Sequence, residues 1–154
     1  MNRRDAEDAE GNVSKKGRMS VPENQISEQI IGAAIEVHRH LGPGLLESAY
    51  RQCMAHELSL RGLAFESEKS LPVRYKGASL DCGYRVDLLV EGKVVVELKA
   101  TEALLPVHSA QVLTYLRLTG CRVGLLINWN VPVLRDGIRR VVLGLDEGTA
   151  CRKV

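Results

Sequence analysis

An antiparallel hairpin predicted near the middle of the chain constrains the fold more than any other feature of the sequence. Two apolar runs, Leu88–Val90 and Val94–Val96, flank the triplet Glu91-Gly92-Lys93. A three-residue loop with a left-handed position at or beside the glycine pairs the last residue of the first run with the first residue of the second. The runs place apolar side chains on both faces of each strand, which is typical of strands covered on both sides.

This register brings two acidic residues opposite each other. Counting back from the loop places Asp87 directly opposite Glu97 on one face, with Cβ atoms about 4.5–5.5 Å apart. Lys99 lies two residues further on and shares that face. One interpretation is a solvated pair with Lys99 as its ion-pair partner, since E-x-K alone is very common. Because charges in a covered strand are costly without partners, we favour a divalent cation, and ligands that are all oxygen favour a hard ion such as Mg²⁺ or Mn²⁺.

The rest of the folded chain predicts helices packed against a sheet. Hydrophobic periodicity and the positions of glycine and proline predict helices at 24–41, 45–61 and 106–119, and strands at 64–68, 71–75, 80–90, 93–100 and 122–128. A further strand at 137–143 is left open. This order predicts an α/β fold with a mixed central sheet flanked by helices. We expect a disordered N-terminal tail at 1–22, a single domain at 23–145 and a C-terminal tail at 146–154.

Length and composition fit one ordinary globular domain. The chain has 154 residues, of which 45% are hydrophobic and 26% are charged. It contains no run of about 20 apolar residues and no apolar segment behind its charged N-terminus, so we expect a cytoplasmic protein without a membrane segment. The four cysteines form no C-x-x-C pair, and the net charge of +2 does not by itself predict nucleic-acid binding.

Four segments in a fixed order carry a resemblance to a known family. They are Gly44-Leu-Leu-Glu47-Ser-Ala-Tyr50, Asp81-Cys-Gly-Tyr-Arg-Val-Asp87, Val96-Glu97-Leu-Lys99-Ala100 and Pro106-Val-His108-Ser-Ala-Gln111-Val-Leu-Thr-Tyr115-Leu. In these segments the chain resembles the PD-(D/E)XK nuclease superfamily, and more specifically the small bacterial proteins named GxxExxY. The likeness covers residues 23–143 and implies a restriction-endonuclease-like core.

The resemblance also implies roles for individual residues. Asp87 and Glu97 would hold Mg²⁺ or Mn²⁺, helped by the main-chain carbonyl of Leu98. Lys99 would orient the attacking water and offset charge on the phosphate. Glu47 resembles the additional acidic residue that contacts the metal directly or through water.

Residues on the two flanking helices have alternative interpretations. Glu47 stands in the first turn of its helix, where the helix dipole also favours a carboxylate, but it shares a face with residues expected to pack inward. Tyr50 is more readily explained by packing than by substrate contact. On the third helix, His108, Gln111 and Tyr115 form a polar stripe. The stripe is either a solvated face or a set of substrate contacts, and Gln111 resembles the glutamine that holds substrate or water in the exonuclease-like branch of the superfamily.

These observations and the resemblance predict a Mg²⁺-dependent nuclease, with DNA favoured over RNA as its substrate. The alternative is a nuclease-derived module that binds nucleic acid or protein and works with a partner. A domain this small has little room for its own sequence-reading module, so we expect weak sequence specificity. A homodimer and a separate specificity partner both stay open.

Overall fold

The computed structural model describes residues 22–144 and 149–153. Three α-helices, one 3₁₀-helix and six strands follow one another in the order α2 (Glu23–Leu41), α3 (Glu47–Leu60), β1 (Phe65–Tyr75), β2 (Ala78–Val90), β3 (Val94–Lys99), α4 (Pro106–Thr119), β4 (Val123–Asn128), η1 (Leu134–Gly137), β5 (Ile138–Leu143) and β6 (Thr149–Lys153). None of the helices in the described part is long and apolar enough to cross a membrane.

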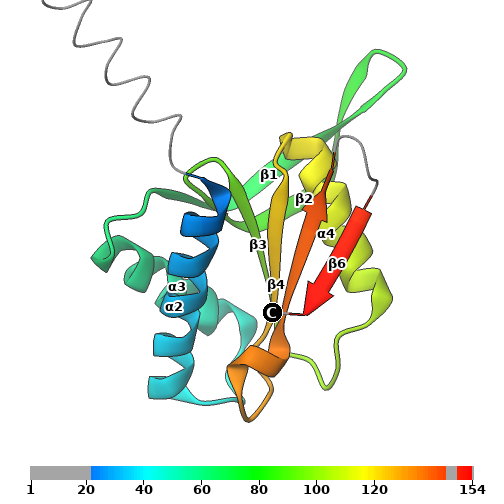
Figure 1. Ribbon diagram of the computed structural model, residues 1–154. Helices are drawn as coiled ribbons and strands as arrows, with labels where there is room; N and C mark the ends of the chain where they lie inside the picture. Colours follow the sequence, from blue (N-terminus) through cyan, green and yellow to red (C-terminus); the bar gives the residue numbers. More distant parts are fainter. Residues whose placement is uncertain (1–21, 145–148, 154) are drawn as a thin grey trace, which may run out of the picture.

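The strands form one mixed sheet in sequential order, from β1 to β6. Strands β3 and β4 pair in parallel, and the other described neighbours pair antiparallel. Helix α4 provides the crossover that a parallel connection requires. Helices α2 and α3 cover one face of the sheet and α4 covers the other, so β3 and β4 are enclosed between two layers (Figure 1).

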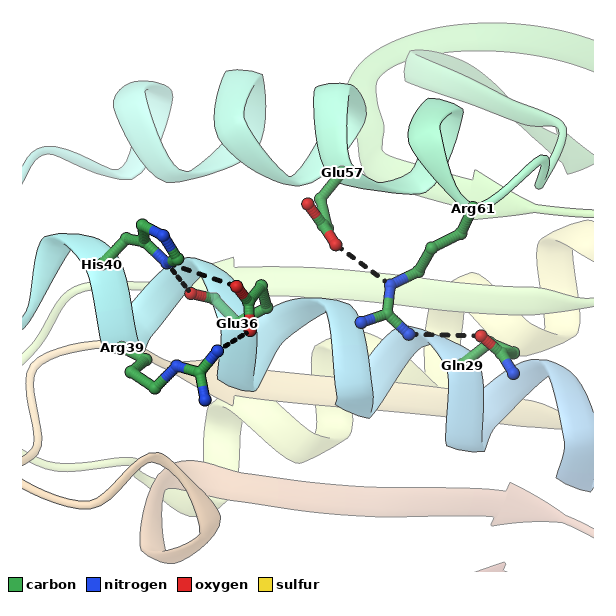
Figure 2. A network of polar contacts seen from close by, with 6 residues as sticks. All are labelled: Gln29, Glu36, Arg39, His40, Glu57 and Arg61. Carbon is green, nitrogen blue, oxygen red and sulfur yellow. Dashed lines mark hydrogen bonds and ion pairs between the residues drawn. The ribbon is translucent and has the colours of Figure 1, made fainter.

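The two helices on the first face are tied to each other by polar contacts as well as by packing. Arg61, just beyond α3, donates from Nη1 to Gln29 Oε1 of α2 at 3.2 Å and from Nε to Glu57 Oε1 at 3.1 Å (Figure 2). On α2, Glu36 pairs with Arg39 at 2.6 Å and with His40 at 3.4 Å. Below this network, α2 and α3 turn their apolar faces to the sheet and enclose the larger of the two hydrophobic clusters.

The predicted hairpin is confirmed in detail. Val90 pairs with Val94, as the three-residue loop requires. Glu91 and Gly92 both have positive φ, at 54° and 63°, which is the left-handed backbone expected at such a loop. The apolar residues of both runs are buried. The α/β architecture with a mixed sheet between helices is also confirmed.

Two strand boundaries differ from the sequence-based prediction. The predicted strands 64–68 and 71–75 are one strand, β1, because pairing with β2 continues through Lys69 and Ser70. Backbone hydrogen bonds to a neighbouring strand thus override a polar interruption in the sequence. Residues 149–153, placed in a C-terminal tail by the sequence analysis, form β6 along the edge of β5. The predicted N-terminal tail lies outside the described residues apart from Pro22.

Candidate active site

Asp87 and Glu97 lie where β2 and β3 separate. The paired register of the two strands extends to Leu88 opposite Val96. One position further, the Leu98 amide donates to Asp87 Oδ2 at 2.8 Å. Glu97 is only 4% exposed, although it carries an ionisable group. The structure therefore brings the two carboxylates together on enclosed strands, as the register predicts.

The electrostatics of this pair are dominated by Glu97, which is buried beside a second acid. The pKa of Glu97 is raised from 4.5 to about 9, first by burial and then by its hydrogen bond with Asp87 and the negative charge of that neighbour. Lys99 acts in the opposite direction through its positive charge, which shows that it lies within electrostatic reach of Glu97. Near neutral pH the pair thus carries less negative charge than two free carboxylates would.

Helix α4 contributes two polar residues on the same side as Glu97. Gln111 Nε2 donates to the Tyr115 hydroxyl at 3.0 Å. Burial and the charge of Glu97 raise the pKa of Tyr115 to about 12. Tyr115 is 3% exposed, and the ring of Tyr84 on β2 contacts it edge-on, with 6.2 Å between centroids. The polar stripe predicted on this helix therefore turns Gln111 and Tyr115 towards the carboxylates and not to solvent.

His108, the third member of the stripe, has a local role. Its Nδ1 accepts a hydrogen bond from the Leu105 amide at 3.0 Å, at the start of α4. That amide precedes the first turn of the helix, where backbone donors have no partner within the helix. His108 therefore caps α4.

Glu47 lies at the end of β3 and not between the two carboxylates. It begins α3, and its Oε1 accepts a hydrogen bond from the Ala100 amide at 3.2 Å. Within residues 22–144 and 149–153, no three His, Cys, Asp or Glu side chains gather in a way that could hold a metal ion. Because Ala100 directly follows Lys99, the side chain of Glu47 lies at the edge of the site near Lys99.

Arg51 joins the site from α3 and was missed by the sequence analysis. Its Nη1 lies 3.7 Å from Asp87 Oδ1, and its Nη2 lies 3.3 Å from Glu68 Oε1 on β1. Only 20% of its side chain is exposed. A signal for this residue was present, because Arg51 follows Glu47 by one helical turn and therefore shares its face.

Asn128, at the end of β4, is a second residue that the sequence analysis missed. It lies beside Lys99 in the parallel register and is 2% exposed. Its side chain accepts from the Thr101 amide at 3.1 Å and donates to the Thr101 carbonyl at 3.0 Å. These bonds fix the chain where it leaves β3. A single amide at the end of an otherwise apolar strand was the available signal.

Tyr50 has the packing role and not the suggested substrate contact. The side chain is fully buried and stacks on Trp129, with 4.5 Å between ring centroids. Its hydroxyl donates to the Gly42 carbonyl at 2.5 Å and accepts from the Leu45 amide at 3.2 Å. Since the hydroxyl is committed to the backbone that joins α2 to α3, it is not available to a substrate.

The donor set fits a hard divalent cation. Two carboxylates are held side by side on covered strands, and burial together with the neighbouring Asp87 keeps Glu97 protonated to a higher pH than a free acid. A cation at this place would replace that proton, and oxygen donors are those that Mg²⁺ and Mn²⁺ prefer. Asp87 and Glu97 are the residues placed to hold it.

Comparison with family models agrees with this geometry. The model of the PD-(D/E)XK nuclease superfamily matches residues 24–141, which include all the residues described above. Neither the curated proteins nor the solved structures yielded a match to the chain. The match covers most of the chain and contains both strands that carry the acidic pair. The chain belongs to the PD-(D/E)XK nuclease superfamily.

Proposed function

We propose that this protein is a nuclease that hydrolyses phosphodiester bonds with the help of Mg²⁺ or Mn²⁺. The observation that carries the proposal is the enclosed pair of Asp87 and Glu97, in which burial and then the neighbouring Asp87 raise the pKa of Glu97 to about 9. Burying two opposed acids is costly and serves no purpose in packing. Perturbed carboxylates of this kind are characteristic of functional sites. Membership of a nuclease superfamily supports the same reaction class.

Each residue of the site has a proposed task. Asp87 and Glu97 hold the cation, with the Leu98 carbonyl as a further ligand. A bound divalent cation lowers the pKa of a water molecule and stabilises charge on the phosphate. Lys99, within electrostatic reach of Glu97, orients the attacking water and offsets charge that builds on the phosphate oxygens. Glu47, at the end of β3, accepts a hydrogen bond from Ala100 and helps to order water at the edge of the site.

Helix α4 supplies the proposed contacts to the substrate. Gln111 and Tyr115 are hydrogen bonded to each other beside Glu97 and present an amide and a hydroxyl to a phosphate or a water. His108 lies one turn earlier on the same helix. We propose DNA as the substrate. The rival function is a binding module that retains the fold without hydrolysis and works through a partner.

The test is cleavage of plasmid, linear duplex, single-stranded DNA and RNA by the purified protein, with and without Mg²⁺ or Mn²⁺. Asp87→Asn and Glu97→Gln are the sharpest variants, because each keeps the size of the side chain and removes its charge. The asparagine also retains an oxygen that can accept from the Leu98 amide. We expect each variant to reduce the cleavage rate by roughly 10²–10³-fold or more, the range found when one group that stabilises the transition state is removed. Glu28→Gln, an exposed acid on α2 outside the site, is the matched control and should cut at the wild-type rate.

Calorimetric titration with Mn²⁺ separates the two functions if nothing is cut. An ion bound by the wild type and lost in Asp87→Asn would support a metal site that needs another substrate. No bound ion and no cleavage would overturn the proposal in favour of the binding module. Cleavage that persists in both variants would overturn the assignment of the residues.

A further inference from the structure

The outer part of the β1–β2 strand pair is largely exposed, and its described contact with a helix is that of Tyr84 with Tyr115 on α4. We call Pro72–Arg85 the β1–β2 arm. Every residue of the arm except Val73 is exposed, and the strands pair with each other there. The arm projects away from the helices and from the remaining strands (Figure 1). A two-stranded ribbon is at best marginally stable alone, so an arm of this length needs a reason other than folding.

The charge of the arm is positive and accessible. Arg74, Lys76 and Arg85 are exposed, against one acid, Asp81. Within the described part of the chain no ion pair is found for these three cations. The Asp81 side chain accepts a hydrogen bond from the Gly83 amide, two residues further along β2, at 3.0 Å. By contrast, the cations Arg39 and Arg61 on the helical face are each paired with a glutamate of a neighbouring turn.

The tip of the arm also carries an exposed aromatic ring. Tyr75 is 60% exposed, and Lys76 Nζ lies 5.4 Å from the centre of its ring. A cation and an aromatic face at one tip can contact a phosphate and a base or sugar together. An acidic protein partner could bind the cations of the arm, but it would not require a cation and an aromatic ring side by side at the exposed tip.

The arm leads directly to the candidate site. Its last two residues, Tyr84 and Arg85, are followed two positions later by Asp87. The ring of Tyr84 contacts that of Tyr115 on α4 edge-on, with 6.2 Å between the ring centroids. The tip at Gly77 is ten positions from Asp87, or about 33 Å along an extended strand. A ligand bound along the arm would therefore run continuously into the site.

We infer that the β1–β2 arm binds the backbone of duplex DNA and lies in its major groove beside the scissile bond. This inference rests on the proposed nuclease function and adds the means by which the substrate is held. The major groove of B-form DNA is about 12 Å wide and admits a two-stranded ribbon, whereas the deep, narrow major groove of duplex RNA does not. Phosphates on both sides of the groove match the unpaired cations of the arm.

The experiment measures binding separately from cleavage. Asp87→Asn protein keeps the DNA intact, and fluorescence anisotropy gives the affinity for a labelled 20-base-pair duplex over a series of salt concentrations. Arg74→Ala/Lys76→Ala is introduced in this background, because both residues lie at the tip and touch none of the site residues. Arg39→Ala/Arg135→Ala, which removes the same charge from α2 and η1, is the matched control. Each lost phosphate contact should lower the slope of log K against log [salt] by about one.

We therefore expect the arm variant to lose about two units of slope and to bind duplex DNA at least about tenfold more weakly near 0.1 M salt. The control variant should change neither the salt slope nor the affinity for duplex DNA. The arm variant should bind duplex RNA as the wild type does. In protein with an intact site, the arm variant should raise KM for duplex DNA with little change in kcat.

The outcomes distinguish failure of the arm from failure of the site. Wild-type cleavage with equal salt slopes in arm variant and control would overturn the arm proposal and leave the nuclease intact. An equal loss of affinity for single-stranded DNA, duplex RNA and duplex DNA would also overturn it, since a groove-specific contact would not behave so. If the wild type cuts no nucleic acid but binds duplex DNA through the arm, the proposed nuclease function is overturned and the proposed role of the arm is supported.

Discussion

Strand β2 has two halves that meet opposite surroundings. From Ala78 to Arg85 all residues are exposed, whereas from Val86 to Val90 all but the half-buried Asp87 are buried. The buried half carries one acid, whose neighbour Glu97 has a strongly raised pKa. The exposed half carries charges that solvent screens. The comparison teaches that one strand can hold an acid of a perturbed pair where it is covered and accessible charges where it is exposed.

The largest expected difference between the two halves is in packing. Leu88 is fully buried and Leu80 is 43% exposed, and both lie on β2. Leu88→Ala should lower the free energy of unfolding by about 2–5 kcal/mol, because it leaves a cavity between the sheet and the helices. Leu80→Ala should change it by no more than about 0.5 kcal/mol. Urea denaturation of both variants measures this, and equal losses would mean that the arm packs against something in solution.

The next difference is in the pH dependence of stability. The unfolded chain releases the Glu97 proton near 4.5, whereas the folded protein without metal keeps it until about 9. The contribution of Glu97 to the free energy of unfolding is therefore fully present below pH 4.5. It falls as the pH rises towards 9, by at most about 1.4 kcal/mol for each pH unit. Glu97→Gln should remove this slope and be more stable than the wild type at pH 8.

The control for this titration lies on the exposed half of the same strand. Asp81→Asn removes a carboxylate from the exposed half and leaves the buried pair intact, so its slope is compared with that of Glu97→Gln. Free energies of unfolding from urea titrations at several pH values, with a chelator present, give both slopes. A Glu97→Gln protein with the wild-type slope would show that Glu97 ionises normally and that the pair is solvated.

The smallest expected effect concerns Arg51, which brings a positive charge to the buried half from outside the strand. Its guanidinium lies 3.7 Å from Asp87 Oδ1 and so competes with a bound cation for that carboxylate. Arg51→Gln should tighten Mn²⁺ binding by up to about tenfold, as expected for removing one like charge at this range in a partly exposed site. Calorimetry measures it, with Arg39→Gln as the control. Weaker binding would mean that Arg51 positions Asp87 and does not compete.

The sequence predicted the fold where local pattern and tertiary contact agree. The loop Glu91–Lys93, the opposition of Asp87 and Glu97, and the helical stripe of Gln111 and Tyr115 all follow from strand and helix periodicity. The single strand β1 did not, because its continuity depends on pairing with β2 through polar residues. Strand β6 did not either, since an edge strand takes its conformation from the neighbour that it joins.

In the candidate site, too, the contacts that escaped prediction are those between residues far apart in the sequence. Arg51 and Asn128 escaped prediction because their partners, Asp87 and Thr101, lie 36 and 27 residues away. Glu47 stays a predicted metal contact, direct or through water, and the bond that its side chain accepts from the Ala100 amide, 53 residues away, could not be predicted from local pattern. Periodicity tells which face a side chain occupies, but the packing angle of one helix on the sheet decides how far along a strand that side chain reaches.

The hydrogen bond from the Leu98 amide to Asp87 Oδ2 has a consequence for the residues that position 87 can accept. At this point a side chain satisfies a main-chain donor of β3, so replacing Asp87 by an apolar residue leaves a partly buried amide without that acceptor. We therefore expect position 87 to keep a side-chain acceptor for the sake of folding, independently of any role in the proposed reaction.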